Sequence, residues 1–231
     1  MTDVAMEPKS DVNVEPKSDV EPKSDVKNAF EPHDINDVLV VGVGGQGVLL
    51  ATDILADVFL AVGSDVRKSE VHGMAQRGGS VESHVRRGPV VHSPLIRRGR
   101  ADALLSMEVL EALRYLHWLR PGGVVLTSLQ RIVPASVVAG GAAYPDTDGI
   151  IAQLRARAGR CAFIDPDALV AAAGDVRTMN VGLIGALSAF VAGVPAAIWE
   201  QVMAARVPAR ALDANRRAFA LGRHLAEDAP A

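Results

Sequence analysis

Cysteine is almost absent from this chain, which has one, Cys161, among 231 residues. One thiol cannot form an internal disulfide, and so little cysteine is typical of a reducing compartment, so we expect a cytoplasmic location. The same count excludes a [4Fe–4S] cluster, which needs four thiolates, and a cysteine-rich zinc site. The six histidines form no HExxH-type pair, and we therefore expect no metal site in this chain.

Aromatic residues and excess charge are also scarce, at 4% of the sequence and a formal net charge of -3. The arginines are scattered and no aromatic platform accompanies them, so we expect no nucleic-acid partner. Residues 178–199 carry no charge and are long enough to cross a bilayer. However, Asn180 and Pro195 interrupt the stretch and no basic flank or aromatic belt marks its ends. We therefore predict buried helices there and no membrane span.

The N-terminal part repeats the motif EPKSDV at 7–12, 15–20 and 21–26. Alternating charges with a proline in every copy cannot bury enough apolar surface to offset the chain entropy. We predict a disordered leader over 1–35, a single globular domain over 36–226 and a short tail over 227–231.

Hydrophobic residues make up 49% of the chain, and the excess lies in alanine, valine and leucine, which suits an α/β core. Strand and helix patterns alternate, which predicts a doubly wound, mostly parallel sheet with a Rossmann-like first βα unit and C-terminal helices. The expected strands are 37–42, 65–70, 80–86, 101–106, 124–128 and 160–164, and the expected helices 46–61, 107–119, 166–173, 180–192, 195–204 and 208–225.

Several polar residues have simple structural explanations. Glu108 and Glu111 open a helix, where carboxylates stabilise the positive end of the dipole. Asn180, near the start of an apolar helix, is expected to cap it. In the strand at 80–86 apolar and polar residues alternate, which predicts one solvated face. The residues of that face are Glu82, His84 and Arg86.

A glycine-rich turn follows the first expected strand, with Gly44, Gly45, Gln46 and Gly47 at its centre. Glycines let the backbone turn sharply, and the N–H groups of the following helix point into the space beyond the strand. With Gly42 the segment matches GxGxxG, the pattern of dinucleotide-binding folds. A tight βα turn that simply needs glycine explains the same residues.

The second glycine-rich segment, SEVHGMAQRGGS at 69–80, is a polar loop before a strand. His72 has a side chain that can act as a general base, and Arg77 offers a planar fork for a carboxylate or phosphate. The glycines permit close backbone approach to an anion. The alternative is a loop whose glycines only turn the chain. The candidate ligand-lining residues here are His72, Gln76, Arg77, Gly78 and Gly79, and none is assigned a catalytic step.

Taken together, several stretches resemble the gamma-type domain of the 2-oxoacid:ferredoxin oxidoreductases, in particular the indolepyruvate type. The likeness runs from about 36 to 225. The stretches that carry it are GVGGQGVLLATDILA at 42–56, SEVHGMAQRGGSVESHVRRG at 69–88, SPLIRRGRADALLSMEVLEALR at 93–114, NVGLIGAL at 180–187 and NRRAF at 215–219.

The resemblance implies an enzyme that oxidatively decarboxylates an aryl 2-oxo acid to an acyl-CoA and reduces ferredoxin. In that family thiamine diphosphate and [4Fe–4S] clusters carry the chemistry. This sequence has neither the cysteines for a cluster nor a GDG motif followed by paired asparagines of the thiamine-binding kind. The resemblance therefore implies a heteromer in which a larger partner subunit holds both cofactors, and through which ferredoxin is reduced.

Within such a complex we expect the crest formed by 44–47 and 72–79 to face the partner's active site and to receive the phosphates of coenzyme A or the substrate carboxylate. Two other functions stay open at this point. An autonomous NAD(P)-dependent oxidoreductase would bind nucleotide as an isolated chain. A non-catalytic assembly subunit would use its glycines only for packing.

Overall fold

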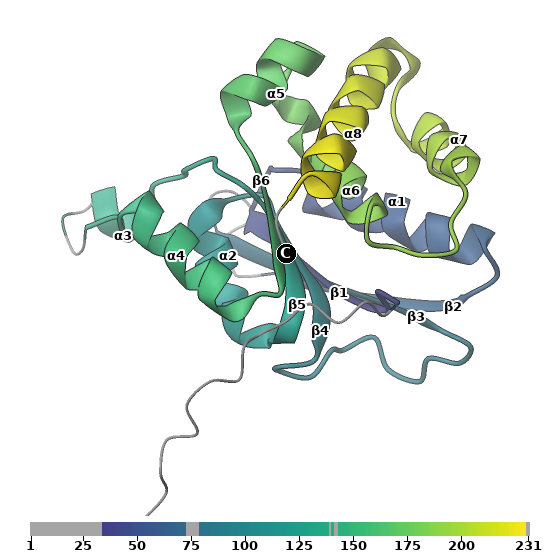
Figure 1. Cartoon of the computed structure of the whole chain (residues 1–231), viewed down its shortest axis with the longest axis horizontal. Helices are drawn as coiled ribbons and strands as arrows, with labels where there is room; N and C mark the ends of the chain where they lie inside the picture. The colour runs from purple at the N-terminus through teal and green to yellow at the C-terminus, as the bar shows by residue number, and fades with distance from the viewer. Residues whose placement is uncertain (1–33, 73–78, 139, 141–142, 230–231) are drawn as a thin grey trace, which may run out of the picture.

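The computed structural model describes residues 34–72, 79–138, 140 and 143–229, and its centre is one six-stranded sheet (Figure 1). The strand order is β2-β3-β1-β4-β5-β6. Only β3 runs against the other strands, since its pairings with β1 and β2 are antiparallel and all others are parallel. The strands are β1 (Asp37–Val43), β2 (Asp65–His72), β3 (Ser80–Gly88), β4 (Ala101–Ser106), β5 (Leu119–Ser128) and β6 (Arg160–Ile164).

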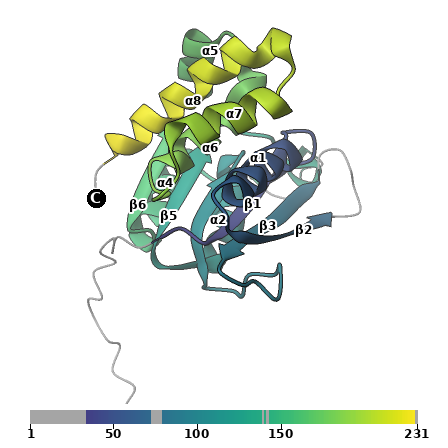
Figure 2. The same cartoon turned by 90° about the vertical axis from the view of Figure 1, so that its right-hand side faces the viewer.

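Helices cover both faces of this sheet, as expected of a doubly wound fold (Figures 1 and 2). Alternate residues of β1 point into two separate cores. Val38 and Val40 pack with α1, α6, α7 and α8, whereas Leu39 and Val41 pack with α2 and α4. The helices are α1 (Val48–Ala61), α2 (Val109–Tyr115), α3 (Ala135–Val138), α4 (Thr147–Arg157), α5 (Pro166–Ala173), α6 (Met179–Ser188), α7 (Ala196–Arg206) and α8 (Leu212–Glu227).

The predicted mostly parallel, doubly wound α/β fold is thus confirmed, with differences at element boundaries. The helix expected at 107–119 ends at Tyr115, and a 3-10 turn over Leu116–Trp118 leads directly into β5. The helix expected at 180–192 ends at Ser188. Helices α3 and α4 were not predicted. Residues 1–33 of the predicted leader lie outside the described residues, while Ile35 is fully buried.

Helix α6 is buried along its whole length and lies against α8 without intervening side chains. A Cβ atom on Gly222 would lie 1.8 Å from the carbonyl oxygen of Gly182, and one on Gly185 would lie 2.1 Å from that of Phe219. The two helices therefore touch backbone to backbone. Within the described residues, no helix has the length and apolar character needed to cross a membrane.

One face of β3 was predicted to be solvated, but its centre is buried. His84 was expected to be solvated but is 1% exposed. The segment after β3 covers it, since the Ile96 N–H donates to His84 Nδ1 at 3.3 Å, and the Trp118 ring lies edge-on at 5.2 Å between centroids. Glu82 and Arg86 are half-buried. A loop and a 3-10 turn thus cover a position that alternation alone assigned to solvent.

Candidate functional site

A pocket of about 270 Å³ opens at the carboxyl ends of β1, β4 and β5. Here α1 follows β1 onto one face of the sheet and α2 follows β4 onto the other, which leaves a crevice between them. Open α/β sheets bind their ligands at such a point. We call this pocket the crevice. Its lining residues are Gly45, Gln46, Gly47, Met107, Gln130, Val176, Arg177, Met179 and Asn180.

The glycine turn after β1 forms one wall of the crevice. Gly45 and Gly47 have φ of 102° and 81°, in the left-handed region that favours glycine. A Cβ atom on Gly47 would also lie 2.4 Å from Asn180 Nδ2, so this glycine is needed for packing as well as for conformation. The Gly44 N–H donates to the Gly79 carbonyl oxygen at 2.9 Å. The structure therefore brings the first crest segment against the end of the second.

Gln46 uses its side-chain amide within the chain. Its Oε1 accepts from the Val43 N–H at 2.7 Å, and its Nε2 donates to the Met107 carbonyl oxygen and to Gln130 Oε1, both at 3.0 Å. These partners follow three neighbouring strands. Gln46 thus ties the carboxyl ends of β1, β4 and β5 together and fixes the floor of the crevice.

Asn180 reaches the crevice from α6 and does not cap that helix as predicted. The N-cap residue is Thr178, which makes no side-chain capping bond. Asn180 Nδ2 instead donates to the Gly47 carbonyl oxygen at 3.3 Å, and its Oδ1 accepts from the Val181 N–H at 2.9 Å. Sequence reasoning missed this contact, because nothing in the local pattern links two residues that lie so far apart in the chain.

The described lining is almost free of charge. Helices α1 and α6 both begin at the crevice, with no acidic residue in the first turn and no side-chain cap. The positive dipole ends of both helices favour a negatively charged or electron-rich group, although in α6 the N–H groups of Met179 and Val181 already donate within the chain. Arg177 is the one charged residue among the described lining, and it lies at the rim, 86% exposed and 2.6 Å from Asp175.

The second candidate segment is described only at its ends. Gln76, Arg77 and Gly78 lie outside the described residues. His72 is the last residue of β2, and its backbone pairs with Val81 of β3, which in turn pairs with Gly42 of β1. The end of β2 therefore lies at the same sheet edge as the glycine turn, as the prediction of one crest requires.

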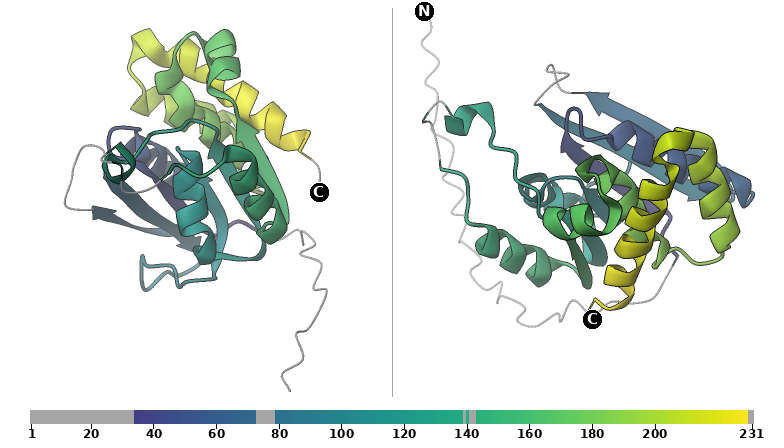
Figure 3. Two further views of the ribbon diagram at one scale, coloured as in Figure 1. Left: turned by 90° about the vertical axis from the view of Figure 1, so that its left-hand side faces the viewer. Right: turned by 90° about the horizontal axis from the view of Figure 1, so that it is seen from above.

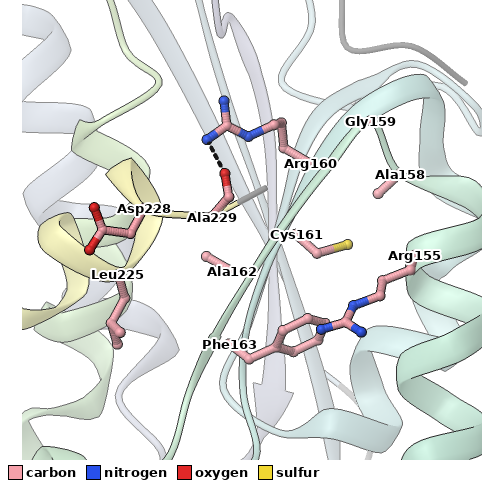
Figure 4. A pocket seen from close by; sticks show the side chains of 10 residues that line it. All are labelled: Arg155, Ala158, Gly159, Arg160, Cys161, Ala162, Phe163, Leu225, Asp228 and Ala229. Atoms are coloured by element: carbon pink, nitrogen blue, oxygen red, sulfur yellow. Dashed lines mark hydrogen bonds between the residues drawn. The ribbon is translucent and has the colours of Figure 1, made fainter. Parts of the chain in front are cut away.

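Strand β6 lies between α4 and α8 at the outer edge of the sheet (Figure 3). A second, larger hollow of about 490 Å³ is lined by residues of these three elements and of the chain around them (Figure 4). The Arg155 guanidinium lies 5.4 Å from the centre of the Phe163 ring, and Arg160 Nη2 donates to the Ala229 carbonyl oxygen at 2.6 Å. Burial raises the pKa of the Cys161 thiol to about 11, which keeps it protonated. No predicted site residue that the structure describes lines this hollow, so the crevice is the better candidate site.

Comparison with known proteins identifies the family of this chain. The model of the family described as "Pyruvate ferredoxin/flavodoxin oxidoreductase" matches residues 37–225. The chain belongs to this family. It is 41% identical over 188 residues to indolepyruvate oxidoreductase subunit IorB of Thermococcus kodakarensis, covering 80% of this chain and 93% of that protein. The corresponding Pyrococcus horikoshii protein is 42% identical over the same shares.

Solved structures show the same fold in this family. The gamma subunit of a keto/oxoacid ferredoxin oxidoreductase from Geobacter sulfurreducens matches with a TM-score of 0.59 and 23% identity, over 83% of this chain and 98% of that chain. A 2-oxoglutarate:ferredoxin oxidoreductase from Magnetococcus marinus matches with a TM-score of 0.63 and 19% identity, over 83% of this chain and 31% of that chain.

The comparisons confirm the predicted resemblance and identify the chain as the small subunit of a 2-oxoacid ferredoxin oxidoreductase. They do not favour an autonomous nicotinamide-dependent enzyme. In the structure Gly42 and Gly47 of the GxGxxG pattern lie close to the side chains of Met107 and Asn180, whereas nothing lies within 4 Å of a Cβ built on Gly45.

Enzymes of this family use thiamine diphosphate and iron–sulfur clusters, and among the described residues no set fits either group. Cys161 is the only cysteine and lies on β6, whereas a cluster needs four thiolates. The described lining of the crevice contains no carboxylate. It therefore lacks the carboxylate by which proteins usually hold the Mg²⁺ that accompanies a bound diphosphate.

Proposed function

We propose that this subunit works in an enzyme that oxidatively decarboxylates aryl 2-oxo acids to acyl-CoA and reduces ferredoxin, and that a larger partner subunit carries the thiamine diphosphate and the [4Fe–4S] clusters. The relatives named indolepyruvate oxidoreductase subunit support the substrate class. The single cysteine supports the placement of the clusters on the partner subunit, because they need thiolates from another chain. We propose the cytoplasm as the location on the same cysteine count.

In this proposal the crest around the crevice faces the partner's active site. Exposed apolar side chains lie next to the crevice in the chain: Leu49 follows the glycine turn, Val133 and Val138 follow Gln130, and Val176 lies in the lining. Each is between 38% and 75% exposed. The observation that carries the proposed orientation is that Val176 in the lining and Leu49, two residues after Gly47, expose apolar side chains at the crevice.

The ligand proposed for the crest is the anionic part of coenzyme A or of the oxo acid. Helix α1 begins at the crevice without a side-chain cap, and Gly45 leaves room for a close approach, because no atom lies within 4 Å of a Cβ built there. Arg77 would add a positive charge to a lining in which Arg177 is paired with Asp175 at the rim, and His72, Gln76, Gly78 and Gly79 would line the mouth.

An Arg77→Ala variant, purified with its partner subunit, tests this function. Loss of a charge-assisted bond to an anion costs about 1.5–3 kcal/mol, so KM for coenzyme A or for the oxo acid should rise roughly tenfold or more. Arg97→Ala removes an exposed arginine of the segment between β3 and β4 and serves as the control. An assembled Arg77→Ala enzyme with wild-type KM values for both substrates would contradict the proposal.

A further inference from the structure

Two buried carboxylates stand behind the crevice, at the start of α2. Glu108 is 1% exposed and Glu111 is 2% exposed, although neither lines the pocket. From the sequence, both carboxylates are expected at these positions because a helix N-terminus favours negative charge. The dipole alone does not require burial, and a buried carboxylate is costly unless several donors satisfy it. The donors that each carboxylate binds therefore indicate what it does.

Glu108 fastens the chain that follows β5. Its Oε2 accepts from the Glu111 N–H at 2.8 Å and caps α2, while its Oε1 accepts from the Ile132 N–H at 3.1 Å and from the Tyr144 hydroxyl at 2.5 Å. In addition, the Val109 N–H donates to the Gln130 carbonyl oxygen at 3.2 Å. The first turn of α2 thus holds the backbone of 130–132 in place.

This anchor acts on the crevice through Gln130. The Gln130 side chain lines the pocket, and its Oε1 accepts from Gln46 Nε2 at 3.0 Å. A shift of the backbone at 130–132 would move this oxygen and break the link that joins β5 to the glycine turn. Glu108 therefore controls the wall of the crevice on the β5 side.

Glu111 acts on the wall that the glycine turn forms, through a segment that contacts this turn. Its Oε2 accepts from the Ser80 hydroxyl at 2.5 Å, and its Oε1 accepts from Arg114 Nη1 at 2.6 Å. Ser80 follows Gly79, whose carbonyl oxygen accepts from the Gly44 N–H at the glycine turn. The contact between the two crest segments thus depends on a serine that Glu111 holds.

We propose that Glu108 and Glu111 are the positioning residues of the crevice, Glu108 acting through Gln130 and Glu111 acting through Ser80 and Gly79. The proposal rests on the proposed function, because it assigns to these walls the binding of a substrate of the complex. Neither carboxylate touches the ligand. Each sets the place of a wall that does, so their loss changes affinity before it changes the rate of the chemical step.

Two matched variants of the assembled complex test the two walls independently. Tyr144→Phe removes one donor from Glu108 and leaves its two amide donors, while Ser80→Ala removes the hydroxyl donor from Glu111. A hydrogen bond to a charged group is worth a factor of about ten or more in the population of the fastened state. We expect amide exchange at 130–132 to rise about tenfold in Tyr144→Phe alone, and exchange at 79–81 to rise in Ser80→Ala alone.

Steady-state kinetics with coenzyme A as the probe then distinguish positioning from general stability. Both variants should raise KM for coenzyme A severalfold with kcat within about twofold of wild type. Unchanged exchange in both variants, or faster exchange with unchanged KM, would overturn the proposal. If the wild-type complex oxidises no 2-oxo acid, the proposed function fails instead, and the exchange data alone still decide whether the two carboxylates fasten the walls.

Discussion

Replacing Gly47 with alanine tests the packing of the glycine turn against α6. Gly47 has φ of 81°, and a Cβ atom there would lie 2.4 Å from Asn180 Nδ2. Gly63 is a matched control, because it has φ of 84° and no atom within 4 Å of an added Cβ. Both alanines pay the same conformational cost of a positive φ, about 1–2 kcal/mol. The difference between them measures the contact with Asn180.

The size of that difference follows from what Asn180 loses. This side chain is 4% exposed, so it cannot swing into solvent, and a displacement breaks its bond to the Gly47 carbonyl oxygen. A buried polar group left without its partner costs about 1–3 kcal/mol. We expect Gly47→Ala to lower the free energy of unfolding by about 2 kcal/mol more than Gly63→Ala does, or about 4–8 °C in Tm for a domain of this size.

Urea denaturation of the full chain, followed by circular dichroism, measures both variants. The double variant Gly47→Ala/Asn180→Ala adds a second check, because the shorter side chain relieves the clash. It should be destabilised by about 1–2 kcal/mol less than the sum of the two single variants. Equal costs at Gly47 and Gly63, or strict additivity in the double variant, would refute the role given to Asn180.

Two further predictions concern titratable groups. Burial lowers the pKa of His84, so its contribution to stability is complete above the ordinary pKa of about 6.5 and is lost as the pH falls through the lower folded value. The Tm should therefore fall on acidification below that pH. The Tm of His84→Gln, which keeps an acceptor for the Ile96 N–H, should fall less; an equal change of Tm with pH in the two proteins would contradict this. Because burial raises the pKa of Cys161 to about 11, alkylation by iodoacetamide at pH 8 should be roughly a hundredfold slower in the native chain than in urea. Similar rates in both states would show that burial does not control this thiol.

The sequence predicted the fold best where local chemistry sets an element's limits. Helix α5 spans the predicted residues because Asp165 caps it, accepting from the N–H groups of Asp167 and Ala168, and because Pro166 opens it. By contrast, α4 was missed since only Ile150 and Leu154 are buried along it, which is too few for a visible apolar stripe.

The site was predictable in part for the same reason. The glycine turn is recognisable from its residue pattern, and the structure brings its Gly44 against Gly79 as the prediction of one crest requires. The contacts that complete the crevice come from α6 and from the chain after β5, through Asn180 and Gln130. Such contacts depend on how distant helices pack, which residue patterns within one segment do not specify. For the same reason alternation placed His84 in solvent although a later segment covers it.

The backbone contact between α6 and α8 limits how this subunit can change over evolutionary time. Most cores adapt by exchanging one side chain for another of slightly different volume. At Gly185 and Gly222 that route is closed, because no side chain is intermediate in size between a hydrogen atom and a methyl group, and the methyl group would overlap a carbonyl oxygen. Since α6 begins at the crevice, the fixed distance between α6 and α8 also constrains the position of the residues by which α6 lines it. Extensions and insertions will therefore be tolerated beyond the end of α8 far more readily than within it.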